Sequence, residues 1–202
     1  MRIFEYGQKE LEYLKRKDKK LGAAIDRIGM IEREITPEPF TALVSSIVSQ
    51  QISNKAAETV WNRLAGLVGI ISPAGIAQAS LSEIQGCGMS VRKAGYIKGI
   101  AEAAIAGAVN FATLHTQTDE EIIKKLPALN GVGIWTAEML LIFSLRRPDV
   151  VSYGDLAIRR GMMNLYGLKN LPQEKFVRYR KRYSPYGSVA SLYLWELSVL
   201  KH

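Results

Sequence analysis

A glycine turn between two helical segments is the part of the sequence best suited to bind an anion. Residues 126–138 read LPALNGVGIWTAE, in which a short helical segment ends, a turn containing Gly131 and Gly133 follows, and a second helix begins. Two glycines around one apolar residue let the backbone turn sharply and lie close to another backbone. The amides after the turn belong to a helix N-terminus, so they would bind a phosphate without reading a base sequence. A plain helical hairpin with a glycine cap is the alternative for this spacing alone.

The full string around the turn resembles the helix-hairpin-helix of DNA glycosylases, in which an apolar-x-G-V/I-G-x-x-T-A string follows a short helix. Residues 129–137, LNGVGIWTA, carry that pattern. The resemblance implies that the hairpin (residues 126–138) contacts DNA through Asn130, Gly131, Val132, Gly133 and Thr136. It also implies a K+ or Na+ ion, with a DNA phosphate as a further ligand, held by the backbone carbonyls of Pro127, Leu129 and Val132.

The same resemblance points to a carboxylate downstream of the hairpin. Members of the family place a catalytic aspartate in the loop before the next helix, and Asp155 in VVSYGDLAIRRG lies at that place. Asp149 is a rival that matches less well, because it directly follows Pro148 at the end of the preceding helix. An aspartate before a helix is also a preferred N-cap, worth about 0.5–2 kcal/mol. The two roles can coexist because a helix N-terminus favours an anion, and an anion beside C1′ would stabilise the positive sugar formed in N-glycosidic cleavage.

The residue before the Thr-Ala of the hairpin bears on the type of glycosylase. Relatives that resemble endonuclease III carry a lysine there, which forms a Schiff base and cleaves the strand. This sequence has Trp135 instead, and its single Cys87 excludes the four-cysteine iron–sulfur cluster of those relatives. The resemblance therefore implies a monofunctional enzyme without lyase activity. Tryptophan at this position is typical of the 3-methyladenine DNA glycosylase II family, whose resemblance covers roughly residues 37–200 but not clearly the first 30.

Aromatic residues are the candidates for a base pocket. By the match of YSPYGSVASLYLWELS to the family's last helix, Trp195 joins Trp135, with Tyr153 and Tyr186 as weaker candidates. Purines alkylated at N3 or N7 are cationic, and an indole face attracts a cation by about 0.5–2 kcal/mol. Their glycosidic bonds are already weak, so no cofactor and no strong general acid are needed. Packing in the core is the alternative for each ring.

A residue must also fill the gap that a flipped base leaves in the duplex, because unstacking costs a few kcal/mol. Gln51 in VSQQIS aligns with the plugging residue of the family, although some relatives have leucine there. Gln50 or Ile52 would share the task. The alternative is that these polar residues only end a helix.

The elements that would position these residues are helical nearly everywhere, which predicts an all-α fold. An amphipathic helix is predicted over residues 8–20, and Thr36-Pro37 resembles the N-cap and first residue of the next helix. Pro185 would open the last helix, and residues 150–153 (VVSY) are the best candidate for a strand. We expect the two-lobed helix-hairpin-helix glycosylase fold with a central cleft. One lobe would comprise residues 36–147, and the other residues 1–35 plus 148–202.

Composition limits the remaining possibilities. The net charge of +8 suggests a polyanionic partner, double-stranded DNA first, although a generic basic surface would give the same value. No membrane span or signal peptide is predicted, so we expect a cytoplasmic monomer, associated with the nucleoid if the source is prokaryotic. The leading prediction is removal of alkylated purines in base excision repair. Two alternatives stay open: a non-catalytic hairpin protein that binds DNA, and a glycosylase for another damaged or mismatched base.

Overall fold

The computed structural model describes residues 2–199, which fold into two compact units. One unit consists of residues 36–140, and the other consists of residues 1–35 together with 141–202. The first boundary lies where the sequence analysis places it. The second boundary is expected at 147/148, next to the proline that follows α9 (Ile134–Phe143). It lies instead at 140/141, within α9, so this helix contributes residues to both units.

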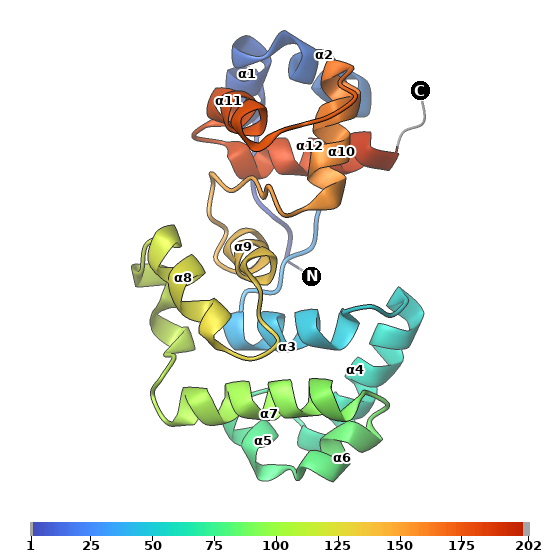
Figure 1. Ribbon diagram of the computed structural model, residues 1–202, viewed down its shortest axis with the longest axis vertical. Coiled ribbons are helices and arrows are strands. Elements are labelled where there is room, and N and C mark those ends of the chain that lie inside the picture. Colours follow the sequence, from blue (N-terminus) through green and yellow to red (C-terminus); the bar gives the residue numbers. More distant parts are fainter. Residues whose placement is uncertain (1, 200–202) are drawn as a thin grey trace. The chain divides into compact units, whose positions relative to one another are not determined.

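The unit of residues 36–140 is built around α7 (Val91–Ile105), which packs against α3, α5 and α6 (Figure 1). Helix α3 buries one apolar face, formed by Phe40, Leu43, Val44, Ile47 and Val48. The helical elements of this unit, in chain order, are α3 (Pro39–Ser49), α4 (Asn54–Val68), α5 (Pro73–Gln78), α6 (Leu81–Gly86), α7, η1 (Phe111–Thr116), α8 (Asp119–Lys125), η2 (Leu126–Ala128) and the first part of α9.

The second unit is built around α12 (Gly187–Val199), whose residues are buried on nearly every side, as expected for a helix that is apolar all round. Gly161 allows α10 (Leu156–Tyr166) to lie close against α12, because a Cβ at that position would overlap the backbone of Leu194. Four helices pack against α12: α1 (Gln8–Lys17), α2 (Lys19–Ile28), α10 (Leu156–Tyr166) and α11 (Gln173–Tyr183).

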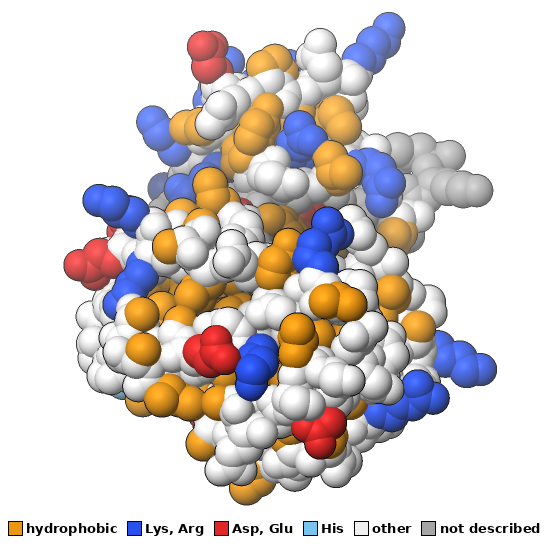
Figure 2. Space-filling model, turned by 60° about the horizontal axis from the view of Figure 1, so that its bottom comes forward, with side chains coloured by type: hydrophobic (Ala, Val, Ile, Leu, Met, Phe, Trp, Pro, Cys, Tyr) orange, Lys and Arg blue, Asp and Glu red, His pale blue; other side chains and the backbone are white. Residues whose placement is uncertain are grey.

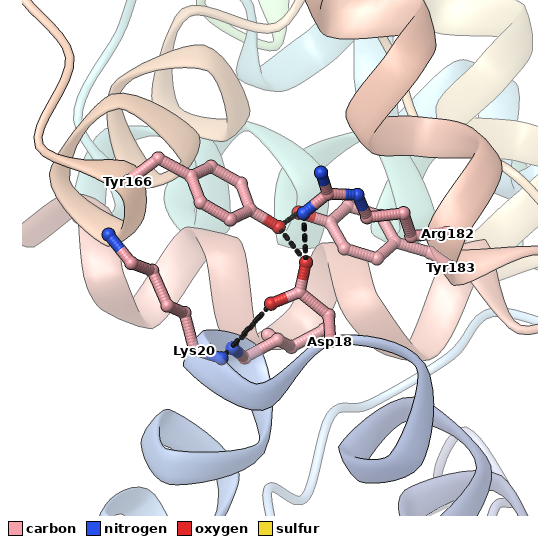
Figure 3. Close-up of polar contacts among 6 residues, drawn as sticks. Asp18, Lys20, Tyr166, Arg182 and Tyr183 are labelled. Atoms are coloured by element: carbon pink, nitrogen blue, oxygen red, sulfur yellow. Dashed lines mark hydrogen bonds and ion pairs between the residues drawn. The ribbon is translucent and has the colours of Figure 1, made fainter.

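A buried carboxylate joins three of these helices (Figure 3). Asp18 caps α2 by accepting hydrogen bonds from the amides of Lys20 and Leu21, both at 3.1 Å from Oδ1. Its Oδ2 accepts from the hydroxyl of Tyr166 at 2.6 Å and from the guanidinium of Arg182 at 3.0 Å. Burial raises the pKa of Tyr166, so its hydroxyl remains a donor to Asp18. The cap therefore also ties α2 to α10 and α11.

Several expectations about the elements are wrong, each for a local reason. The helix over residues 8–20 is interrupted at Asp18, which is extended and starts α2. Helix α3 begins at Pro39 rather than Pro37, because a residue before proline, here Glu38, is kept out of helical conformation.

Two further differences lie near α12. Residues 150–153 form no strand, because the backbone of Val150 bonds to serines of α12 instead: its amide donates to Ser188 and its carbonyl accepts from Ser191. Helix α12 begins at Gly187 rather than at Pro185. At its first residue, the amide of Gly187 donates a hydrogen bond to the carboxylate of Asp149.

Within residues 2–199, pairing of extended backbone is limited to one isolated bridge, between Ile3 and Glu34. No helix among these residues is long and apolar enough to cross a membrane.

Candidate functional site

The hairpin of residues 126–138 forms as a short 3-10 turn, a loop and the start of α9 (Figure 1). The amide of Val132 donates to the carbonyl of Leu129 at 3.1 Å, and the side chain of Val132 is buried, which fixes the loop from inside. Gly131 has a φ of 85°, and a Cβ there would overlap the ring of Tyr96 on α7. Both features require glycine. The carbonyl of Gly133 accepts from Ala137 at 3.1 Å, so α9 starts immediately after the turn.

The expected DNA contacts of the hairpin divide into exposed and buried groups. Asn130 and Gly133 are exposed, whereas the side chain of Thr136 is buried. A contact of Thr136 or Val132 with DNA would therefore use the backbone, as suits the amides at the start of a helix. Trp135 is 42% exposed, so its indole is not a core residue.

The loop between α3 and α4, residues 50–53, is called here the insertion loop. Gln51 is exposed and has a φ of 56°, a left-handed conformation that is uncommon for a residue other than glycine. Ile52 is also exposed. Gln50 differs, because its side-chain amide donates to the carbonyl of Gly131 at 3.2 Å. The structure thus leaves Gln51 and Ile52 at the surface and uses Gln50 to connect the insertion loop to the hairpin.

Asp155 is the N-cap of α10, in the unit of residues 1–35 and 141–202. Its Oδ1 accepts from the amide of Ile158 at 2.9 Å, and its Oδ2 accepts from the indole nitrogen of Trp195 at 3.3 Å. The residue is 7% exposed. The ring of Phe143 lies 5.4 Å from that of Trp195, tilted by 30°. The carboxylate therefore lies at a helix N-terminus and beside an aromatic side chain, which in turn packs against Phe143.

The rival carboxylate, Asp149, has a structural role. Its Oδ2 accepts from the hydroxyl of Ser184 at 2.6 Å, and its Oδ1 accepts from the amide of Gly187 at 3.0 Å. The backbone carbonyl of Asp149 accepts from Arg180 at 3.1 Å. Because both carboxylate oxygens hold the start of α12, this residue has a complete structural explanation.

The two tyrosine candidates behave differently. The ring of Tyr153 lies between the ring of Phe176, at 5.1 Å, and the guanidinium of Arg159, at 5.1 Å. Arg159 is on the first turn of α10, so Tyr153 stays near Asp155. Tyr186 packs edge-on against Tyr13, at 5.2 Å. It precedes Gly187, and about 12 Å of helix rise separates Gly187 from Trp195. The structure therefore does not bring Tyr186 to Trp195.

Sequence reasoning missed the contacts that hold these groups in place. The ammonium of Lys93 donates to the backbone carbonyls of Val48 and Gln50. Nothing in the spacing of Lys93 signals this, because its partners lie on a distant segment. Figure 2 shows basic side chains dispersed over the face it presents rather than gathered into one patch.

Comparison with known proteins defines the class to which this fold and these residues belong. Residues 44–183 match the model of the HhH-GPD superfamily base excision DNA repair proteins, and the chain belongs to that superfamily. Among its relatives, DNA-3-methyladenine glycosylase 1 of Schizosaccharomyces pombe is 36% identical over 168 residues, which cover 81% of this chain and 74% of the relative.

Solved structures agree with this assignment. The crystal structure of a DNA-3-methyladenine glycosidase from Bacillus halodurans has a TM-score of 0.87 and 37% identity, and the match covers 98% of this chain and 93% of that one. The 3-methyladenine DNA glycosylase of Schizosaccharomyces pombe in complex with abasic DNA has a TM-score of 0.82 and 31% identity, covering 96% and 98%. With 98% of the chain covered, most of the first 30 residues share the fold although their sequence shows no clear resemblance.

Proposed function

We propose that this protein is a monofunctional DNA glycosylase that removes alkylated purines from duplex DNA as the first step of base excision repair. The observation that carries the proposal is the carboxylate of Asp155, placed at the N-terminus of α10 and bonded to the indole of Trp195. Relatives named for 3-methyladenine excision support the substrate class.

The chemistry asks for an anion near the sugar. Cleavage of the N-glycosidic bond develops positive charge at C1′ of the deoxyribose. The carboxylate of Asp155 would stabilise that charge and orient the attacking water. Its position is fixed from two sides, since one oxygen is held by the amide of Ile158 and the other by Trp195. A group fixed before the reaction stabilises charge without a cost of reorganisation.

The aromatic residues suit the cationic base. An alkylated purine carries its own positive charge, so an electron-rich indole would attract it, and no general acid is needed to activate the leaving group. Trp195 and Trp135 are the two rings that we assign to this task, and Tyr153, two residues before Asp155 in the chain, is a weaker candidate. Trp195 also bonds to Asp155, which links base recognition to the catalytic carboxylate.

The hairpin would hold the DNA backbone. Amides at the start of α9 suit a phosphate. The carbonyls of Pro127, Leu129 and Val132 suit a K+ or Na+ ion, because hard neutral oxygens are what alkali ions prefer. The carbonyl of Leu129 accepts from Val132, and its second lone pair can serve the ion. We expect affinity for duplex DNA to be higher in potassium than in choline chloride at equal ionic strength. Equal affinities in the two salts would argue against the ion.

The proposal includes the absence of lyase chemistry, because Trp135 occupies the position of the Schiff-base lysine in bifunctional relatives. Borohydride added during turnover should therefore trap no covalent protein–DNA complex. A trapped complex would show a bifunctional enzyme. We further propose that the protein is a monomer and that it acts on DNA in the cytoplasm. That both units contact one duplex across a cleft stays a prediction.

The deciding experiment is incubation of the protein with methylated duplex DNA, followed by chromatography of the bases released. We expect free 3-methyladenine and 7-methylguanine from the wild type and neither from Asp155→Asn. Release of 8-oxoguanine or hypoxanthine from parallel duplexes that contain those bases, with no release from methylated DNA, would mean another specificity. Binding without release of any base, equal in wild type and mutant, would mean a non-catalytic hairpin protein.

A further inference from the structure

The insertion loop is held by a lysine that no motif identifies. The ammonium of Lys93, on the first turn of α7, donates to the carbonyl of Val48 at 2.9 Å and to the carbonyl of Gln50 at 2.5 Å. These carbonyls belong to the end of α3, where the helix leaves its last acceptors without intrahelical donors. A cation there also offsets the negative end of the helix dipole. Burial lowers the pKa of Lys93, which means that placing the ammonium here costs desolvation free energy. The hydrogen bonds to the two carbonyls offset that cost.

The same helix also contacts the hairpin. One turn after Lys93, the ring of Tyr96 lies against Gly131 so closely that a Cβ would overlap it. Gln50 completes the connection, since its carbonyl is bound by Lys93 and its side-chain amide donates to the carbonyl of Gly131 at 3.2 Å. Lys93 and Tyr96 thus fix two loops at a constant spacing along one face of α7.

The strained residue lies next to the point that Lys93 holds. Gln51 follows Gln50 directly and has a φ of 56°. A conformation of this kind is strained for a residue other than glycine and persists only where neighbours impose it. With the carbonyls of Val48 and Gln50 fixed, the chain must turn at Gln51, which exposes that side chain at the tip of the loop.

We propose that Lys93 is a positioning residue for base flipping: it holds the insertion loop in register with the hairpin, so that Gln51 enters the duplex while the hairpin grips the backbone. The inference rests on the proposed glycosylase function and deepens it. Lys93 touches neither base nor phosphate in this role. It acts through the backbone of Gln50, and its loss should affect the opening of the base pair rather than the cleavage of the glycosidic bond.

Lys98 supplies a matched control on the same helix. Its ammonium also donates to two carbonyls, of Ala77 at 3.1 Å and Ala79 at 2.8 Å, and it is half-buried like Lys93. It forms in addition a long ion pair with Glu102, at 3.9 Å. Lys93→Met and Lys98→Met therefore remove the same kind of interaction. Only the first removes it from the insertion loop.

The test measures single-turnover excision of 7-methylguanine placed either opposite cytosine or opposite an abasic site, where no pair has to be opened. Because opening a pair costs a few kcal/mol, Lys93→Met should slow excision about tenfold or more opposite cytosine and less than about threefold opposite the abasic site. Lys98→Met should stay within about threefold in both duplexes, and Lys93→Arg should restore most of the rate. Equal losses in the two duplexes, or equal losses for the two methionine variants, would overturn the proposal.

A second readout does not depend on catalysis. 2-Aminopurine in a duplex fluoresces when it leaves the stack, and the wild type should raise this signal while Lys93→Met should not. If the wild type raises the fluorescence, Lys93→Met does not, and the wild type releases no base, then the proposed function fails and the role of Lys93 stands. If Lys93→Met raises the signal as the wild type does, the role of Lys93 fails, whatever the excision assay gives.

Discussion

Replacing Asp155 with asparagine separates the two roles of this residue, because asparagine is as good an N-cap as aspartate but carries no charge. The two donors bind different oxygens of Asp155, and asparagine replaces one oxygen by NH2, so the hydrogen bond from Ile158 or the one from Trp195 is lost. One hydrogen bond is lost, which costs about 1–2 kcal/mol. For a chain of this size that corresponds to a fall of roughly 2–8 °C in the melting temperature.

The expected loss of activity is much larger than this loss of stability. The removal of one fixed electrostatic group from a catalytic site lowers the rate by about 10²–10³-fold, equivalent to roughly 2.7–4 kcal/mol. The protein should stay folded, since it retains the cap of α10. Single-turnover release of 7-methylguanine from duplex DNA at saturating enzyme, with thermal unfolding of the same preparation, measures both quantities.

Asp149→Asn is the control for this experiment. Asparagine there can still accept from the amide of Gly187 and donate to the hydroxyl of Ser184, so the start of α12 should persist. Its excision rate should stay within about threefold of the wild type, a change of less than about 0.7 kcal/mol. The reasoning is refuted if Asp155→Asn keeps more than about a tenth of the wild-type rate, or if the two variants lose activity equally.

Three further predictions concern the surroundings of these groups. Trp195→Phe removes the donor to Asp155 and should slow excision about fivefold, with a stability loss of about 1–2 kcal/mol like that of Asp155→Asn; an unchanged rate would mean that the hydrogen bond does not orient the carboxylate. Gly133→Ala should weaken binding to duplex DNA without lowering the melting temperature, because its Cβ meets nothing within 4 Å in the protein. Gly131→Ala should lower both, with a stability loss of about 1–3 kcal/mol from its positive φ; similar unfolding curves for the two alanine variants would contradict this. Asp18→Ala should cost about 2–4 kcal/mol in urea denaturation by leaving its donors unpaired, and a loss below about 1 kcal/mol would show that water replaces the carboxylate.

The sequence is most informative where a local signal is enough. The N-caps of α4, α5, α7 and α8 are of the preferred residue types, serine or threonine, and each accepts a hydrogen bond from a backbone amide: Ser53, Ser72, Ser90 and Thr118. Asp155 is predicted in the same way, as a capping residue at the position of the family's aspartate. A cap depends on residues only a few positions apart, so its signal lies in a short string.

The sequence is least informative where an element depends on a distant partner. Asp18 interrupts a helical pattern because its carboxylate accepts hydrogen bonds from Tyr166 and Arg182. Both donors lie far along the chain. The residues around Val150 resemble a strand, but serines of α12 satisfy their backbone. In both cases the local pattern is correct about apolarity and wrong about which segment supplies the hydrogen bonds.

The functional loops combine the two cases. The glycines of the hairpin can be recognised in the sequence because the backbone conformation of the turn restricts the residue type. The second reason for Gly131 cannot be recognised there, because the ring that it contacts belongs to Tyr96 on another helix. Gln51 looks like an ordinary polar residue at a helix end, and only its φ of 56° and the hold of Lys93 on its neighbour show that its position is imposed. A motif thus identifies the candidate groups for contact with DNA. The residues that set their spacing become visible only through contacts, as Lys93 does through the carbonyls of Val48 and Gln50.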